Sequence, residues 1–116
     1  MHELSIAARV IDVAARHAAG QGAGRIVAVT LRIGRLSCVS PEALRQGFAL
    51  LAEGTPCAGA ALHVEEVPVR VWCESCREER ELPGIQRLAC PACGAAAGAI
   101  RAGRELDVES ITVEDP

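Results

Sequence analysis

Aromatic side chains are almost absent from this 116-residue sequence, which has one Phe (Phe48), one Trp (Trp72) and no Tyr. Half of the residues are nevertheless apolar, so a buried core has to be built from Ala, Val, Leu and Ile. The length suits one ordinary domain, or one core with a small additional lobe held by a metal.

An excess of positive charge is also missing, because the formal net charge is −3 and the isoelectric point is below neutral. Proteins that bind nucleic acids usually present a basic face together with aromatic side chains on which bases stack. Neither feature is present here. The composition therefore argues against a nucleic-acid partner.

Long hydrophobic runs are lacking, and no apolar stretch approaches the roughly 18 residues of a membrane span. His2, Glu3, Arg9 and Asp12 interrupt the N-terminal segment, so it has no apolar signal-peptide core. We therefore expect no membrane association and a cytoplasmic, reducing compartment. In such a compartment cysteines bind metals more often than they form disulfides.

Six cysteines stand out against this background, and four of them form two CxxC pairs separated by 13 residues: Cys73, Cys76, Cys90 and Cys93. This spacing can surround one tetrahedral ion with four thiolates and is typical of a structural zinc ribbon. Two disulfides, a redox pair or an iron site would fit the same pattern. The turn formed by each CxxC pair, a knuckle, often needs a residue with positive φ directly after its second cysteine. Gly94 can adopt this conformation in the second knuckle, whereas the first has Arg77 there and is predicted to be less ideal.

Signatures of catalysis are missing as well. We find no Ser/His/Asp arrangement, no paired carboxylates and no phosphate-binding loop, and a four-thiolate zinc ion leaves no open position for a substrate. We therefore do not expect an enzyme. Cys38 and Cys57 stand alone in the sequence and are interpreted as small buried or half-buried thiols, not as ligands.

Hydrophobic periodicity predicts helices over residues 3–19 and from Pro41 onward, with Ser40 as N-cap of the second. Strands are predicted over 26–33, 61–71 and 105–114. The last two each contain a one-residue slip in their apolar alternation. We interpret the slips as β-bulges in two strands that neighbour each other.

These elements predict an α+β fold in which two helices and a three-stranded sheet form one layered domain, residues 1–70 with 104–116. Residues 71–103 form an inserted zinc-ribbon lobe with little apolar material of its own. A structural zinc ion can contribute roughly 10–16 kcal/mol, which would compensate for that small core.

The N-terminus offers a second group of metal ligands. In Met1-His2-Glu3, the terminal amine and the backbone nitrogen of His2 can close a five-membered chelate ring, and that nitrogen and Nδ1 of the same histidine a six-membered one. A nitrogen-rich, flattened set of this kind suits Ni(II) or Cu(II) far better than Mg or Ca. Glu3 also fits as an acidic residue in the first helical turn.

Several segments together resemble the HypA/HybF family of nickel metallochaperones for hydrogenase maturation, and the similarity covers essentially the whole chain in the same order. Besides the two CxxC pairs, the segments are Met1-His2-Glu3-Leu4-Ser5-Ile6-Ala7, Ile33-Gly34-Arg35-Leu36-Ser37, Pro41-Glu42-Ala43-Leu44 and Gly103-Arg104-Glu105-Leu106.

This resemblance implies that Ni²⁺ is transported, bound through His2 with Met1 and with Glu3 as a further ligand or a support. It also implies that Zn²⁺ is structural and bound by Cys73, Cys76, Cys90 and Cys93. The expected partners are a HypB-like GTPase and the large subunit of a [NiFe] hydrogenase. In some organisms the family also serves urease, which adds urease maturation factors to the partners.

One position departs from the family pattern. The family commonly has an acidic residue where this chain has Ser40, and in some members that residue completes the nickel site. Either Glu42 or water takes the place of this acidic residue here, or nickel is held by fewer protein groups.

The alternative function for the whole chain is a zinc-ribbon interaction module that transfers no metal.

Overall fold

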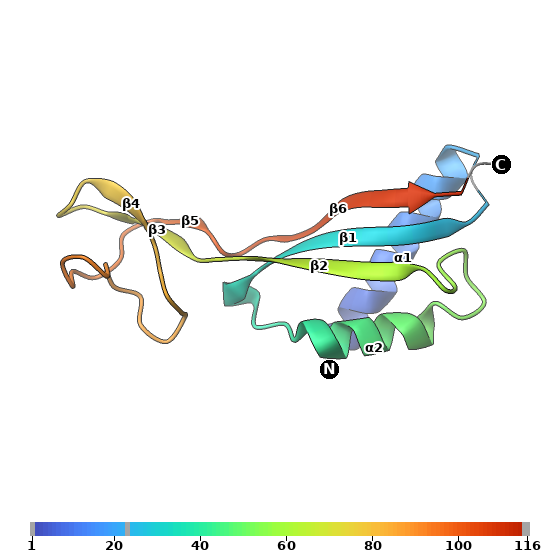
Figure 1. Cartoon of the computed structure of the whole chain (residues 1–116), viewed down its shortest axis with the longest axis horizontal. Coiled ribbons are helices and arrows are strands. Elements are labelled where there is room, and N and C mark those ends of the chain that lie inside the picture. The colour runs from blue at the N-terminus through green and yellow to red at the C-terminus, as the bar shows by residue number, and fades with distance from the viewer. Residues whose placement is uncertain (1, 23, 115–116) are drawn as a thin grey trace. The chain divides into compact units, whose positions relative to one another are not determined.

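The computed structural model describes residues 2–22 and 24–114 and contains two α-helices, a 3₁₀ helix and six strands (Figure 1). In chain order these are α1 (His2–Gly20), β1 (Ile26–Gly34), η1 (Arg35–Ser37), α2 (Pro41–Leu51), β2 (Ala61–Val67), β3 (Arg70–Cys73), β4 (Glu78–Glu81), β5 (Ile100–Ala102) and β6 (Leu106–Val113). The predicted α+β class, with two helices and a three-stranded sheet, is confirmed. None of the helices within the described residues is long and apolar enough to cross a membrane.

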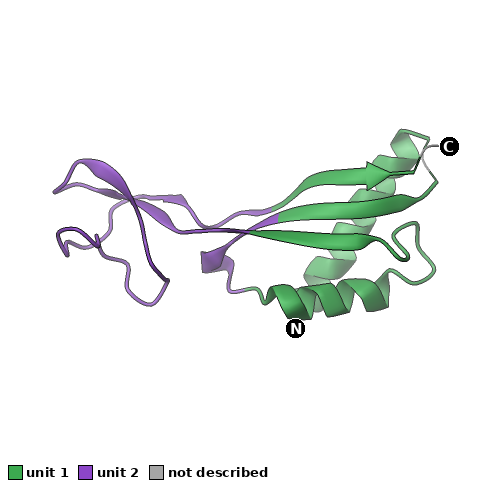
Figure 2. Ribbon diagram, in the orientation of Figure 1, with its two compact units in different colours: residues 1–31, 39–65, 107–116 green, residues 32–38, 66–106 purple. Residues whose placement is uncertain are grey.

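The chain divides into two compact units (Figure 2). Unit 1 consists of residues 1–31, 39–65 and 107–116, and unit 2 of residues 32–38 and 66–106. The boundaries expected from the sequence lie at 70/71 and 103/104. Both helices lie in unit 1, and all four cysteines of the CxxC pairs lie in unit 2.

Unit 1 contains most of a sheet with the strand order β2-β1-β6, and α1 and α2 run alongside it (Figure 1). The buried side of α1 consists of Ala7, Val10, Ile11, Ala14 and Ala18, whereas Leu4 and Val13 are exposed. Phe48 of α2 is only 2 % exposed. In β1, Val29 and Leu31 are buried, whereas Ala28 and Thr30, which alternate with them, are half-buried. The core of unit 1 is therefore built almost entirely from aliphatic side chains.

Helix α2 begins as predicted, because Ser40 is its N-cap and Pro41 its first residue. The Oγ atom of Ser40 accepts a hydrogen bond of 3.2 Å from the backbone N–H of Ala43. This bond satisfies one of the free N–H groups of the first turn and stabilises the helix by about 1 kcal/mol.

The predicted strand over 61–71 is two strands in two different sheets, so the interpretation of its apolar slip as a β-bulge was wrong. β2 ends at Val67 and β3 begins at Arg70. Pro68, which lies between them, has no N–H and cannot extend a ladder. The two strands predicted to be neighbours, β2 and β6, lie on opposite sides of β1.

Unit 2 contains a second sheet with the order β4-β3-β5, and its strands β4 and β5 were not predicted from the sequence. β3 pairs antiparallel with β4, and this pairing places Arg80 opposite Val71 and Glu78 opposite Cys73. The buried cluster of Val69, Val71 and Leu82 forms a small core, and partly buried apolar side chains pack against it.

Candidate metal centres

The four cysteines of the CxxC pairs converge in unit 2, and their sulfur atoms all lie within 4.8 Å of one another. The Sγ atoms of Cys73 and Cys93 are 3.6 Å apart, and those of Cys76 and Cys90 are 3.9 Å apart. Both distances greatly exceed a disulfide bond of about 2.05 Å, and all six cysteines of the chain are free thiols. The arrangement is therefore a cage of four sulfurs that come from two knuckles.

Each knuckle is closed by the same backbone hydrogen bond. The N–H of Arg77 donates to the carbonyl of Cys73 (2.7 Å), and the N–H of Gly94 donates to the carbonyl of Cys90 (2.8 Å). Both closing residues have positive φ, 54° at Arg77 and 80° at Gly94. The prediction that the first knuckle is the less ideal one is confirmed, because Arg77 adopts a conformation that disfavours a side chain.

Backbone pairing fixes the second knuckle to β3. The N–H of Trp72 donates to the carbonyl of Ala99 (2.9 Å), and the N–H of Gly98 donates to the carbonyl of Trp72 (3.0 Å). Cys73 and Cys90 are buried, Cys76 is half-buried and Cys93 is exposed. The cage is thus held by the sheet on one side and reachable by solvent on the other.

The residues of this cage fit a zinc ion. Four sulfurs around Zn²⁺ with Zn–S bonds of about 2.3 Å lie about 3.8 Å apart at tetrahedral angles, close to the 3.6 and 3.9 Å of the two close pairs. A bound Zn²⁺ would act as a Lewis acid that keeps the four thiols deprotonated and crosslinks the two knuckles.

The electrostatics of the sulfurs favour a cation as well. Hydrogen bonds from the N–H groups of Cys93 and Ala92 lower the pKa of Cys90 to about 6. The N–H of Ala95 lowers the pKa of Cys93, but the neighbouring thiols and burial raise it to about 11. The pKa values of the two thiols are thus driven apart, and a positive ion between the sulfurs would favour the deprotonated form of each.

The second predicted group of ligands lies at the start of α1, where His2 and Glu3 are the first two residues of the helix. Met1 lies outside the described residues. Nε2 of His2 is 3.4 Å from Oε2 of Glu3, and the side chains are 58 % and 22 % exposed. The same Oε2 accepts a hydrogen bond of 3.3 Å from the backbone N–H of Ser40.

Glu3 thus connects the N-termini of both helices of unit 1. The hydrogen bond from the Ser40 N–H is the largest of the effects that lower the pKa of the Glu3 carboxyl, and the nearby His2 contributes in the same direction. Glu42 is exposed in the first turn of α2.

The other two cysteines lie apart from the sulfur cage: Cys57 is buried as expected, whereas Cys38 is exposed, contrary to expectation.

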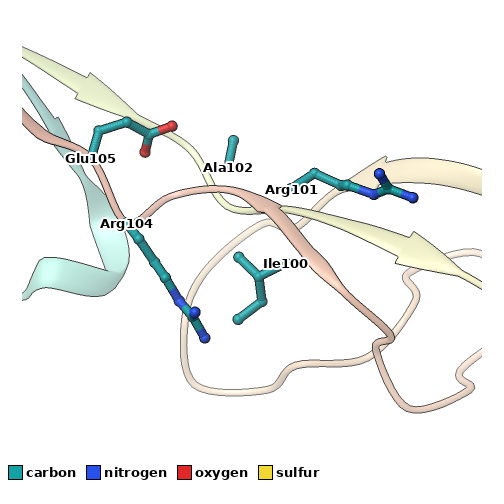
Figure 3. Close-up of a pocket in the computed structure, with 5 residues that line it drawn as sticks. All are labelled: Ile100, Arg101, Ala102, Arg104 and Glu105. Atoms are coloured by element: carbon teal, nitrogen blue, oxygen red, sulfur yellow. The ribbon is translucent and has the colours of Figure 1, made fainter.

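A surface pocket with a volume of about 260 Å³ lies in unit 2 and is lined by five consecutive or nearly consecutive residues: Ile100, Arg101, Ala102, Arg104 and Glu105. In Figure 3 the guanidinium groups of its two arginines point in different directions. The carboxylate of Glu105 accepts a bond of 2.8 Å from the N–H of Gly103. The pocket has no converging polar groups among these side chains and contains none of the predicted site residues.

The fold and these sites define a class of protein: a small α+β protein with a four-cysteine metal centre and a helix that starts with His-Glu. Over residues 1–113 the chain matches a family model described as "Hydrogenase/urease nickel incorporation, metallochaperone, hypA". The chain therefore belongs to the HypA family, and the resemblance noted from the sequence is confirmed.

Full-length relatives agree with this assignment. A protein named hydrogenase maturation factor HypA from Chloroflexus aggregans is 48 % identical over 116 residues and covers 100 % of both chains. Proteins with the same name from Desulfitobacterium hafniense and Streptomyces avermitilis are 39 % and 42 % identical, cover 99 % of this chain, and are themselves covered to 100 % and 88 %.

Two solved structures share the fold. The solution structure titled as the Ni metallochaperone HypA from Helicobacter pylori matches with a TM-score of 0.65 and 21 % identity, covering 96 % of each chain. A solution structure of a HypA protein matches with a TM-score of 0.72 and 23 % identity, covering 98 % of this chain and 97 % of the other.

Proposed function

We propose that this protein is a nickel metallochaperone that takes up Ni²⁺ at its N-terminus and delivers it during [NiFe] hydrogenase maturation. Nickel is bound at Met1 and His2, with Glu3 as a further ligand or a support, within the domain of residues 1–70 and 104–116. A structural Zn²⁺ is bound by Cys73, Cys76, Cys90 and Cys93 within residues 71–103. Membership of the family described for hydrogenase and urease nickel incorporation carries this proposal.

The start of α1 supports a nitrogen-rich nickel site. Because α1 begins at His2, the backbone nitrogen of this residue has no carbonyl partner within the helix. Nε2 of the imidazole lies beside Glu3, which leaves Nδ1 for the metal. The amine of Met1, the amide nitrogen and Nδ1 can then chelate one Ni²⁺, once the nitrogens have lost their protons.

The contacts of Glu3 favour a supporting role. Its Oε2 already accepts the Ser40 N–H and faces the imidazole of His2. A carboxylate on the non-coordinating nitrogen of a histidine fixes the ring orientation and makes the ligand more basic. The hydroxyl of Ser40 is engaged with Ala43 as the helix cap, so it is a poor replacement for an acidic ligand.

An exposed site at a chain end suits delivery, because competing ligands in an acceptor can displace the protein groups one at a time. The imidazole of His2 is more than half exposed. In this proposal the protein acts in the cytoplasm with a HypB-like GTPase, and the hydrogenase large subunit receives the metal. Urease maturation factors are further acceptors where urease is made.

Nickel titration of the untagged protein by calorimetry tests the proposal. We expect His2→Ala to abolish tight nickel binding while the zinc content stays at one ion per chain, because the two centres share no ligand. His63→Ala is the matched control, since His63 is exposed on β2 in the same unit and its loss should leave nickel binding unchanged.

Adding one residue before Met1 should also impair nickel binding, because it displaces the chelating amine. If nickel binds equally well to the wild type, His2→Ala and the extended chain, the N-terminal site is wrong. Zinc binding without any nickel binding would instead favour the alternative, a zinc-ribbon interaction module.

A further inference from the structure

The β3–β4 hairpin of unit 2 has two faces with different arginines. Residues directly opposite each other in an antiparallel pair share a face, so the pairing of Val71 with Arg80 and of Cys73 with Glu78 puts these four side chains on one side. Arg70 lies on the other side, where it contacts Glu79 (2.6 Å). Of the two arginines in β3 and β4, Arg80 is therefore the one that shares a face with Cys73 of the sulfur cage.

The guanidinium group of Arg80 is incompletely satisfied in its surroundings. Its side chain is 29 % exposed, and one terminal nitrogen donates a 3.0 Å bond to Glu78. The Nε atom is buried and has no hydrogen-bond partner within the described part of the chain. A buried N–H of a charged group that lacks an acceptor is costly, so this nitrogen needs an acceptor that the bare thiols supply poorly.

The sulfur cage supplies the acceptors nearest to this side chain. Cys73 lies diagonally across the β3–β4 ladder from Arg80, on the same face, and all four cage sulfurs lie within 4.8 Å of one another. Metal-bound thiolates accept far stronger hydrogen bonds from a cation than neutral thiols do.

The negative charge of the zinc-loaded centre favours a cationic side chain such as Arg80 beside it. Zn²⁺ with four thiolates carries a net charge of −2, and the hairpin beside it adds four carboxylates: Glu74, Glu78, Glu79 and Glu81. A positive group that donates to the sulfurs lowers their electron density and stabilises the deprotonated state.

We propose that Arg80 is a positioning residue of the four-cysteine centre, which donates to the cage sulfurs once they hold zinc and thereby strengthens zinc binding. This inference rests on the proposed zinc site. Arg80 holds the two knuckles together through their sulfurs and partly neutralises the loaded centre. The strand pairing of β4, not sequence proximity to a cysteine, places it there.

The test compares full-length Arg80→Gln and Arg80→Lys with the matched control Arg87→Gln, which removes the same charge at an exposed position three residues before Cys90. Zinc affinity is measured by competition with a chromogenic chelator. We expect Arg80→Gln to weaken zinc binding by about tenfold or more, which is the usual effect of removing a group that hydrogen-bonds to a metal ligand. Arg80→Lys should recover part of the affinity, and Arg87→Gln should match the wild type.

A spectroscopic readout separates this role from a general packing role. In the Co²⁺-substituted protein, Arg80→Gln should shift the thiolate-to-cobalt charge-transfer band to lower energy, because the sulfurs lose a donor. If Arg80→Gln takes up no metal, the Arg80→Lys variant carries the test, and a failure to restore binding overturns the inference.

Equal affinities and unshifted bands in all three variants would also overturn it. A wild-type protein that holds no zinc with its cysteines reduced would show, independently of Arg80, that the proposed zinc site itself is wrong.

Discussion

Two residues at equivalent positions of the two knuckles differ in how well they suit their backbone. Arg77 and Gly94 both have positive φ and both donate to the carbonyl of the first cysteine of their pair. For a residue with a Cβ this conformation costs about 1–2 kcal/mol, whereas glycine adopts it freely. The first knuckle therefore contains strain that the second does not.

Replacing Arg77 by glycine should stabilise the zinc-loaded protein. The relief of about 1–2 kcal/mol of strain is partly offset by the greater freedom of glycine in the unfolded chain, about 0.5–1 kcal/mol, so we expect a net gain of about 0.5 kcal/mol. The measurement is the thermal midpoint of the zinc-loaded protein.

Two variants control for charge and for position. Arg77→Ala removes the same charge but keeps a Cβ, so it should give no gain. Gly94→Ala should lose about 1 kcal/mol, and because no atom lies within 4 Å of the added Cβ this loss is conformational. A gain for Arg77→Ala as large as that for Arg77→Gly would assign the effect to charge.

The two cysteines outside the cage should differ in reactivity. Burial raises the pKa of the Cys57 thiol, an effect that a hydrogen bond with the Thr55 side chain partly offsets. A raised pKa means less thiolate at neutral pH, so Cys57 reacts slowly, and only a higher pH would increase its thiolate fraction. Cys38 is exposed.

We therefore expect a maleimide at neutral pH to label the zinc-loaded protein first at Cys38, then at the four cage cysteines after a chelator is added, and at Cys57 only in denaturant. Mass spectrometry of tryptic peptides gives the order, with Cys38→Ser as control. Labelling of Cys57 as fast as that of Cys38 would show that its burial is not maintained in solution.

Among the elements, those with strong local signals could be predicted from sequence and those without could not. The apolar stripes of α1 and the Ser40-Pro41 start of α2 determine their helices within the local sequence. β4 could not be predicted, because Glu78–Glu81 consists only of charged residues and becomes a strand through pairing with β3. The site followed the same pattern: the cysteines were found from their spacing, whereas Arg80 was missed because its place depends on that pairing.

The end of β1 shows how closely elements of unit 2 approach each other. The N–H of Gly34 donates to the carbonyl of Glu105 (2.7 Å), and the N–H of Leu36 donates to the carbonyl of Gly103 (2.9 Å). A Cβ at Gly34 would overlap the carbonyl carbon and oxygen of Gly103. Gly34 itself has φ −72°, which any residue can adopt, so its constraint is purely steric.

Gly34→Ala should therefore destabilise the protein by about 3 kcal/mol or more, because backbone atoms have to move to admit one methyl group. Urea unfolding of the zinc-loaded protein measures the loss. Gly20→Ala at the end of α1 is the control, since no atom lies within 4 Å of its added Cβ, and it should be neutral or slightly stabilising. Equal effects of both substitutions would show that the close approach at Gly34 is absent in solution.

At the scale of the whole molecule, the two units differ in what holds them together. Both α-helices and Phe48 belong to unit 1, whereas the core cluster of unit 2 has three buried side chains, Val69, Val71 and Leu82. A structural zinc ion contributes roughly 10–16 kcal/mol to the folding of a small metal-binding domain. The metal should thus matter far more to unit 2 than to unit 1.

Removal of zinc by a chelator should consequently unfold the cysteine knuckles of unit 2 while the helices of unit 1 remain. The single tryptophan reports on unit 2, since Trp72 lies in β3 beside Cys73 and its ring lies 5.3 Å from the guanidinium of Arg101. We expect its fluorescence to change on zinc removal while the helical circular dichroism signal stays near its initial value, and Cys73→Ser should reproduce the change without a chelator. Loss of the helical signal in step with the fluorescence change would mean that unit 1 cannot fold without the metal of unit 2.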